Sequence, residues 1–310
     1  MKRFVIKTVC IALPLLVVAL ALEVLLRIIP NDYTFKKNYL DNHSFEIETL
    51  ILGSSHSFYG INPDYFSRKT FNASHISQSL VYDLAIVKKY EDRFENLKTV
   101  VLPISYFTLY GKLEAGPESW RIKNYMIYYG MNSSKLFTDY FEVLSNRLDV
   151  NVKRLLSYYV FGNPAVTCTE SGWGVGYNSK NAQDLIESGK TAAQRHTIKD
   201  LHSAKYQEIV NDNIQTLKTI IQWCKERRVR ILLLTTPAFE TYLKHLNAKQ
   251  YNTTIKTTRD ICADYSNCKY LNLIDDTRFV STDFFDADHL SDRGAQKLSK
   301  LIGDVIVGWE

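Results

Sequence analysis

The chain has 310 residues, of which 45% are hydrophobic and 23% are charged. These values are ordinary for a globular protein, and they exclude a disordered chain, a collagen-like repeat and a disulfide-stapled miniprotein. The formal net charge is +5, and it falls to +2 once the first 30 residues, with four basic side chains and one acidic one, are set aside. So small a charge does not indicate nucleic-acid binding.

The N-terminus predicts a membrane span. Residues 8–22 carry no charge, and the apolar run continues to about residue 29, interrupted by Glu23 and Arg27. A transmembrane helix needs about 20 mostly apolar residues, which this stretch supplies. We therefore expect a single N-terminal membrane anchor over residues 1–30.

The charges before the span predict its orientation. Lys2, Arg3 and Lys7 precede the apolar run, and positively charged flanks stay in the cytoplasm. Residues 31–310 should therefore form a domain outside the cytoplasm, in the periplasm if the cell has an outer membrane. A cleaved signal peptide is the alternative, because Ala19–Ala21 resembles a small-residue cleavage pattern.

Beyond about residue 45, short apolar runs alternate with longer amphipathic ones. Strands are predicted at Thr49–Leu52, Thr70–Asn72, Thr99–Ile104, Arg230–Thr235 and Lys269–Leu273. Helices are predicted at Gln78–Leu97, Ala204–Arg227, Glu240–Asp264 and Asp292–Val307. Nearly all-apolar strands that are separated by helices indicate a parallel sheet with both faces covered. We predict a three-layer α/β/α fold with a central parallel sheet of about five strands.

Residues 112–203 break this rhythm and predict an insertion into the domain. They are rich in Tyr, Ser, Asn and Gly, with helical pieces near 134–160 and an expected exposed loop at Glu170–Thr191. Trp120 and Trp173 lie here, and aromatic faces stack on sugars. Ordinary packing is the commoner role of such side chains, so a glycan groove is only one of two interpretations.

The first candidate site is Gly53-Ser54-Ser55-His56-Ser57, directly after the first predicted strand. Functional loops of parallel sheets lie at the carboxyl ends of the strands. A serine at the start of the following helix has an exposed hydroxyl beside free backbone N–H groups, which can stabilise an oxyanion. Gly53 gives the turn its freedom and lets a substrate approach. The same residues are equally typical of a serine-rich helix cap.

The second candidate site is Asp286-Ala287-Asp288-His289-Leu290-Ser291, before the last predicted helix. An Asp and a His three residues apart can meet within one turn of chain, so that the carboxylate orients the imidazole and stabilises its charged form. A polar loop ending in a helix cap is the alternative. A serine needs a base and the base needs an orienting group, so the two sites together favour nucleophilic catalysis.

With both sites in view, the sequence resembles the SGNH (GDSL-like) hydrolase superfamily over about residues 48–110 and 204–308. In that family the nucleophile follows a Gly-x pair after the first strand, and a D-x-x-H motif precedes the last helix. The resemblance implies that Ser55 is the nucleophile, His289 the base and Asp286 the orienting carboxylate. It also implies the SGNH, flavodoxin-like fold. More narrowly, the chain resembles membrane-anchored SGNH-like proteins that are associated with the acylation of cell-envelope glycans.

The chain departs from the family pattern at three places. Ser54 stands where the family has aspartate, and Ser77 stands at the place of a glycine whose backbone N–H serves the oxyanion. Ser105 lies where the family has an oxyanion-binding asparagine and is the candidate substitute. A missing donor typically costs about a hundredfold or more in rate, or about 3 kcal/mol. His56, next to the nucleophile, is a candidate substrate contact.

The leading interpretation is an extracytoplasmic serine esterase or O-acyltransferase that works through an acyl-serine intermediate. The acyl group is expected to be acetyl, the substrate a cell-envelope glycan or another acylated molecule, and the partner a membrane-bound acyltransferase. No cofactor or metal is expected, because no Cys/His cluster has zinc spacing and no carboxylate cluster is present. The alternative is a catalytically degenerate SGNH domain that binds glycan or partners in a modification or export complex. His196, His202 and His245 are interpreted as surface or packing residues.

Overall fold

The structure is a computed structural model that describes residues 1–132, 134 and 136–309. It divides into two compact units, each built from two separate stretches of chain. The anchor unit consists of Met1–Asn38 and Pro117–Val166, and the sheet unit consists of Tyr39–Gly116 and Thr167–Glu310.

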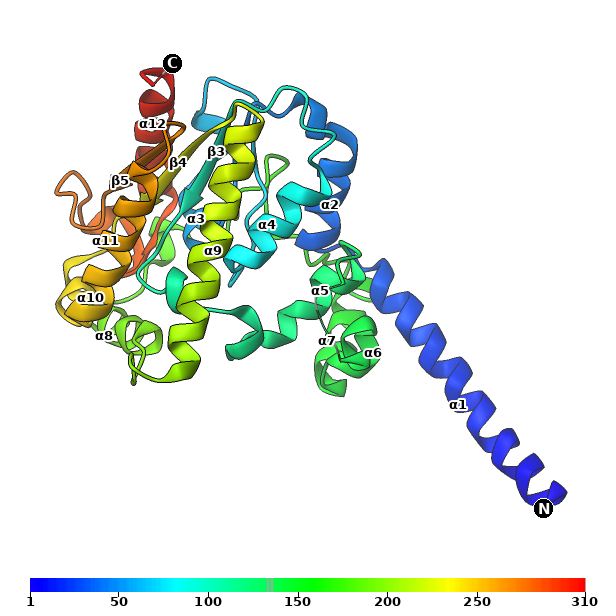
Figure 1. Cartoon of the computed structure of the whole chain (residues 1–310). Coiled ribbons are helices and arrows are strands. Elements are labelled where there is room, and N and C mark those ends of the chain that lie inside the picture. Colours follow the sequence, from blue (N-terminus) through cyan, green and yellow to red (C-terminus); the bar gives the residue numbers. More distant parts are fainter. Residues whose placement is uncertain (133, 135, 310) are drawn as a thin grey trace. The chain divides into compact units, whose positions relative to one another are not determined.

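The sheet unit is built on five parallel strands in the order β2-β1-β3-β4-β5 (Figure 1). This arrangement confirms the predicted α/β class. In the register of the sheet, Ile51 at the end of β1 pairs with Asn72 on one side and Val101 on the other. The strands are β1 (Thr49–Ile51), β2 (Thr70–Asn72), β3 (Thr99–Pro103), β4 (Arg230–Thr235) and β5 (Cys268–Asn272).

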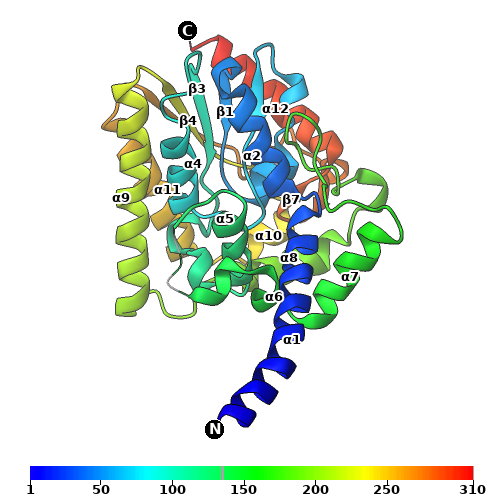
Figure 2. The same ribbon diagram turned by 90° about the vertical axis from the view of Figure 1, so that its right-hand side faces the viewer.

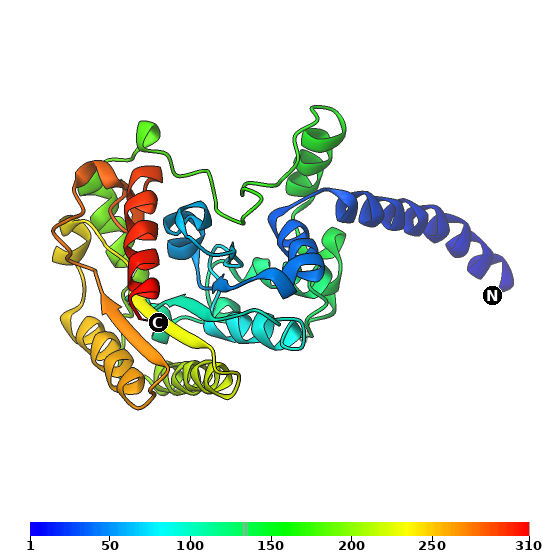
Figure 3. The same cartoon turned by 90° about the horizontal axis from the view of Figure 1, so that it is seen from above.

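Helices cover both faces of this sheet, because each apolar face must be buried against another layer. In Figure 3, α4, α9 and α11 lie on one side of the strands, and α3 and α12 lie on the other. Helices α8 and α10 pack against each other. The helices of this unit are α3 (Ser55–Gly60), α4 (Leu80–Lys89), α8 (Leu185–His196), α9 (Ala204–Glu226), α10 (Glu240–Lys244), α11 (Ala248–Ala263) and α12 (Asp292–Val307).

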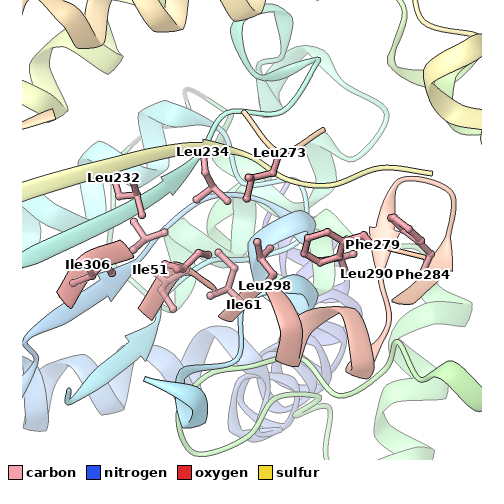
Figure 4. Packing of buried hydrophobic residues seen from close by; sticks show 12 residues of the cluster. Ile51, Ile61, Leu232, Leu234, Leu273, Phe279, Phe284, Leu290, Leu298 and Ile306 are labelled. Atoms are coloured by element: carbon pink, nitrogen blue, oxygen red, sulfur yellow. The ribbon is translucent and has the colours of Figure 1, made fainter. Parts of the chain in front are cut away.

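The core between the sheet and α12 fixes the position of the last helix (Figure 4). Ile51 and Leu232 from the strands are fully buried against Leu298 and Ile302 of α12. The α12 residues recur at a spacing of four, so one apolar stripe faces the sheet. Ser291 caps the helix by accepting from the Gly294 N–H. The loop before α12 is thereby held against the end of β1.

Two predicted helices differ from the structure by more than two residues. Helix α4 was expected to reach Leu97, but it ends at Lys89. The chain beyond it turns away because Asn96 bonds to the carbonyl of Phe45 at 2.7 Å. The predicted helix 240–264 is split into α10 and α11, and Asn247 caps the second of them.

The expectation of an exposed loop at Glu170–Thr191 was correct only in part, since many of these residues are exposed but the segment is neither all loop nor loosely attached. Helix α8 begins inside this segment, at Leu185. Before it, the Gly174 N–H donates to the carbonyl of Phe58 at 2.8 Å, and the Trp173 indole N–H donates to the carbonyl of Tyr59 at 2.7 Å. The polar, glycine-rich composition suggested exposure, yet it is the glycines that let this segment approach α3 closely.

The residues before α12 form a small antiparallel hairpin instead of a plain loop. Its strands are β6 (Phe284–Asp286) and β7 (His289–Leu290). Asp286 and His289 are paired across the turn of this hairpin. The D-x-x-H spacing therefore places both side chains beside each other through a fixed backbone.

The anchor unit contains α1, α5, α6 and α7. Among the described residues, α1 is the one helix long and apolar enough to cross a membrane, by its length and composition. Its C-terminal turns contact α6 and α7, and Figure 2 shows these helices together. The helices are α1 (Lys2–Ile28), α5 (Ile122–Ile127), α6 (Glu142–Ser145) and α7 (Leu148–Tyr159), and α2 (Asp32–His43) runs across the boundary of the two units.

A buried ionic cluster holds the loops of this unit together. The Glu142 carboxylate is fully buried, and it binds Lys123, Arg154 and the Tyr128 hydroxyl. Burial alone would raise the pKa of Glu142, but the two cations outweigh it and lower the pKa to about 2. Glu142 is therefore ionised, as a buried carboxylate with two cationic partners must be.

Candidate active site

Ser55 lies directly beyond β1 as the first residue of α3. The chain reaches it through Gly53, whose φ of +105° lies in the region that favours glycine. A Cβ at this position would also meet Ser57 Oγ at 2.5 Å. The Gly53 requirement predicted from the sequence is thus both conformational and steric. It presents Ser55 at the carboxyl edge of the sheet, where β1 adjoins β2 and β3.

Ser55 and His289 meet in the folded chain, 234 positions apart in sequence. The Ser55 Oγ lies 2.9 Å from His289 Nε2. On the other side of the ring, His289 Nδ1 lies 3.0 and 3.1 Å from the two Asp286 carboxylate oxygens. With Nδ1–H donating to the carboxylate, Nε2 of the neutral ring is the acceptor and faces the serine hydroxyl.

Backbone groups hold the Asp286 carboxylate in place. Its Oδ1 accepts from the N–H of Asp288 at 3.1 Å and from the N–H of His289 at 2.8 Å. These bonds close the hairpin turn and fix the direction from which the carboxylate faces the ring. Because both ends of the pair belong to one turn, their geometry depends little on distant packing.

A second carboxylate, Asp288, faces the same histidine from inside the protein. It is 2% exposed, and its Oδ1 lies 3.4 Å from His289 Nδ1. Burial opposes a charged imidazole, but Asp288 and Asp286 outweigh it and raise the pKa of His289 to about 10. The same attraction holds the pKa of Asp288 well below its usual value, although burial alone would raise it. Sequence reasoning gave Asp288 no role, although its place beside the histidine was the available signal.

His56 contacts Asp288 and is buried next to the triad. Its Nε2 lies 3.5 Å from Asp288 Oδ2, and its ring meets that of His289 edge-on, with 4.7 Å between centroids. Burial lowers the pKa of His56. Among the described residues, Nε2 of His56 and both carboxylate oxygens of Asp288 have no partner within hydrogen-bond criteria, so this pair is held by charge and packing.

Ser105 contacts His56 and Thr108. Its hydroxyl lies 2.7 Å from His56 Nδ1, and its backbone N–H donates to Thr108 Oγ1 at 2.9 Å. Ser77 follows β2 and has a φ of 60°, the left-handed conformation that favours glycine. The backbone at Ser77 therefore has the form expected at the family's glycine position.

His196 was interpreted from the sequence as a surface or packing residue, but it lies beside this cluster. Its Nδ1 is 3.5 Å from Asp288 Oδ2 and 3.1 Å from the Tyr242 hydroxyl. Burial lowers its pKa to about 3, so it is neutral. Nothing local in the sequence marks it, because the contact joins α8 to a hairpin more than 90 residues away.

An aromatic stack flanks His289 on the other side. Tyr177 lies between Tyr59 and Phe285, with ring centroids 3.7 and 4.0 Å apart and near-parallel planes. Its edge faces His289 at 5.1 Å. Both faces of Tyr177 are occupied by protein, so this stack is packing that positions the histidine and not an open platform for a sugar.

Three residues of the site also have ligand atoms close enough together for a metal ion. Nitrogen or carboxylate oxygen atoms of His56, Asp288 and His289 lie within 4.8 Å of one another. However, Nδ1 of His289 faces Asp286 and Nε2 faces Ser55. A metal bound to His289 would therefore have to displace one of these two contacts.

No protein-family model and no curated protein matches this chain. Several solved structures are similar to it. A proposed platelet activating factor from Streptococcus pneumonia is 13% identical, with 96% of this chain and 99% of that chain covered and a TM-score of 0.45. A proposed acylhydrolase from Bacteroides fragilis is 11% identical, with 87% and 95% covered and a TM-score of 0.42. A GDSL-like lipase from Bacteroides thetaiotaomicron is 10% identical, with 90% and 100% covered and a TM-score of 0.41. Similarities with TM-scores below 0.5 carry no information about chemistry, which therefore follows only from the residues of this site.

Proposed function

We propose that this chain is a serine esterase or O-acyltransferase of the SGNH type. The observation that carries the proposal is the contact chain from Ser55 Oγ to His289 Nε2 at 2.9 Å, and from His289 Nδ1 to Asp286 at 3.0 Å. A nucleophile, a base and an orienting carboxylate within hydrogen-bond reach are the parts that acyl transfer needs.

In the first half-reaction, Ser55 Oγ attacks the acyl carbonyl carbon of an ester while its proton passes to His289 Nε2. The tetrahedral intermediate then collapses, the bond to the leaving oxygen breaks, and His289 returns the proton to that oxygen. Asp286 and Asp288 stabilise the imidazolium between these two events, consistent with the raised pKa of His289. Backbone N–H groups of Ser55 and Ser77 are the proposed oxyanion donors.

In the second half-reaction, water or a sugar hydroxyl gives its proton to His289 and attacks the acyl carbon of the acyl-serine. The bond from this carbon to Ser55 Oγ then breaks, and His289 returns the proton to Ser55 Oγ. Water yields hydrolysis and a sugar hydroxyl yields transfer. We propose acetyl esters of a cell-envelope glycan as the substrate, because α1 is apolar enough to hold the domain at a membrane surface. Lys2, Arg3 and Lys7 before the span support a location outside the cytoplasm. A membrane-bound acyltransferase that supplies the acyl group is the proposed partner.

A non-catalytic role in glycan or partner binding is the second candidate, and one observation favours it. The loop after β3 has no asparagine, the backbone N–H of Ser105 donates to Thr108, and the Ser105 hydroxyl is in contact with His56. The third family oxyanion donor therefore has no evident replacement among the described side chains of that loop.

Covalent labelling distinguishes the two candidates. A fluorophosphonate probe reacts with an activated serine, so the intact protein should be labelled at Ser55, as located by peptide mass spectrometry. Ser55→Ala should abolish labelling, whereas Ser54→Ala should retain it. Absence of labelling in the folded wild-type protein, at a pH high enough to deprotonate His289, would favour the binding role.

A further inference from the structure

Helix α7 of the anchor unit exposes a continuous apolar stripe. Leu148, Val152, Leu156 and Tyr159 are spaced by four, four and three residues, and are 75%, 44%, 47% and 46% exposed. This spacing places them on one side of the helix. Val160 and Phe161, which are 64% and 69% exposed, extend the stripe. We call these six residues the apolar face.

The opposite side of α7 is polar and points into the unit. Asn151 is 4% exposed and donates to the carbonyl of Glu142 at 3.1 Å. Arg154 donates to the buried Glu142 carboxylate at 2.6 Å. A helix at a water-facing surface turns its apolar stripe inward, whereas α7 turns its stripe outward and directs Asn151 and Arg154 into the unit. A large exposed apolar patch of this kind marks a surface that another apolar phase covers.

The membrane-spanning helix is bound to residues 140–143, the segment that precedes α7. The Glu23 carboxylate in α1 accepts from the backbone N–H of Val143 at 2.9 Å and pairs with Arg27 at 2.6 Å. Arg27 in turn donates to the carbonyl of Tyr140 at 2.6 Å. The two charges that interrupt the apolar run are thus neutralised by each other and by this segment, as charges at membrane depth must be.

The length of α1 places this junction at the membrane boundary. A span of about 20 residues covers about 30 Å, so a span that begins after Lys7 ends close to Arg27. The Tyr159 hydroxyl donates to the carbonyl of Leu25, in the last turns of that span, at 3.0 Å. Tyr159, at one end of the apolar face, therefore contacts the part of α1 that reaches the edge of the hydrocarbon core.

We propose that the apolar face of α7 rests in the interfacial layer of the same bilayer that α1 spans. The occupant is lipid, because the face is continuous with the lipid-facing helix and belongs to the same compact unit. The anchor unit then has two membrane contacts, one across the bilayer and one along its surface. A helix in this position inserts its apolar side to a depth of roughly 5–10 Å. The proposal requires that α1 span a membrane, and it does not depend on the catalytic role of Ser55.

The test places a fluorescent label on each side of α7 in the full chain. Val152→Cys lies in the middle of the apolar face, and Lys153→Cys is the matched control, exposed on the same helix but turned about 100° away from Val152. Each is coupled to an environment-sensitive dye in a parent in which the cysteines that are not buried are replaced by serine, Cys10, Cys168 and Cys268. The proteins are reconstituted into phosphatidylethanolamine/phosphatidylglycerol vesicles, and flotation with the vesicles verifies insertion of α1.

The proposal predicts that a doxyl quencher attached to lipid chains quenches the label at position 152 at least about twofold more than the label at position 153. Aqueous iodide should show the opposite preference. Equal quenching of the two labels by iodide, in protein that floats with the vesicles, would overturn it. Protection of position 152 from iodide without doxyl quenching would also overturn it, because a second copy or another protein would then cover the face. Failure to float would remove the premise that α1 spans the bilayer.

Discussion

Asp288 Oδ2 lies 3.5 Å from Nε2 of His56, the residue that follows the proposed nucleophile. The site therefore has a second carboxylate–histidine pair beside Asp286 and His289. Asp288 also faces His289, so its charge acts on the base as well. This pair distinguishes the site from a minimal triad and makes the pH dependence of the proposed reaction a test of its electrostatics.

Removal of the Asp288 charge should move the pH profile of activity. Only neutral His289 can accept the serine proton, so kcat/KM for an acyl ester should rise with pH above the ordinary histidine value near 6.5. Asp288→Asn removes one of the two carboxylate charges that raise this pKa, and the rising limb should shift to lower pH. Asp276→Asn, whose carboxylate pairs with Arg278, is the control and should leave the limb in place. An unshifted limb in Asp288→Asn would contradict the assigned role of Asp288.

Ser55→Ala should abolish turnover and leave the melting temperature nearly unchanged. The loss of one half-buried hydroxyl at the start of a short helix should cost under about 1 kcal/mol. His289→Ala should lose activity to a similar degree, because triad members act as a unit. The assay should contain acetylated glycan together with an acceptor glycan, with Ser54→Ala as the neighbouring control. Equal activity of wild type and Ser55→Ala, in transfer and in complementation, would sink the catalytic proposal.

Asp83 should make the protein less stable as the pH rises. Its buried carboxylate accepts from the Gly53 N–H at 2.7 Å and from Gln78 at 2.6 Å, and burial raises its pKa from 3.8 to about 7. The native state then binds a proton that the unfolded state has released, so stability is present below pH 3.8 and falls as the pH approaches 7.

Asp83→Asn replaces the titratable carboxyl group with a neutral amide, which still offers an oxygen acceptor. From pH 5 to pH 8, the wild type should lose about 3 kcal/mol of stability relative to the variant, because the slope of about 1.4 kcal/mol per pH unit fades out near the native pKa of about 7. Denaturant unfolding at pH 5 and pH 8 measures the difference. A constant gap between the two proteins at both values would show that Asp83 does not titrate in this window.

Substitution of Gly174 should disturb α3. A Cβ there would meet ring atoms of Phe58 at 2.4 and 2.6 Å, whereas a Cβ at Gly176 would meet Tyr59 at an ordinary 3.5 Å. Overpacking of this kind costs about 1–3 kcal/mol, so Gly174→Ala should lower the melting temperature and the activity, and Gly176→Ala should do neither. If both substitutions had the same small effect, residues 170–181 would be a loosely packed loop and not a segment packed closely against α3.

A protease added to cells with a permeabilised outer layer tests the proposed topology. If the positive residues before α1 stay in the cytoplasm, the chain should be digested from about residue 40 onward and a short N-terminal fragment should survive. A cytoplasmic control protein must remain intact in the same sample. Protection of the region beyond residue 40 would place the domain inside the cell.

The sequence predicted the regular elements where local signals were strong. The bounds of β2, β4 and α12 agree with the expected ranges, because short apolar runs flanked by polar residues, and a helix capped by Ser291, are local features. The contact of Ser55 with His289 followed from placing two motifs at one edge of a parallel sheet.

What the sequence missed depends on contacts between distant segments. The D-x-x-H spacing selected Asp286, but it says nothing of how deeply Asp288 is buried or that His196 approaches it from α8. Likewise, no local pattern showed that Gly174 lies against Phe58, because the partner is more than 100 residues away. Composition described this segment as polar and left its surroundings unknown.

The Ser55–His289 contact has a consequence for biosynthesis, because 234 positions separate its two residues. The ribosome delivers the serine early and the histidine almost last, and a contact between such distant residues closes slowly compared with local structure. A nascent chain therefore carries the serine without its base throughout most of its synthesis. Under the proposed mechanism, truncation before the final hairpin leaves a chain without a base, so an unfinished copy cannot attack an ester.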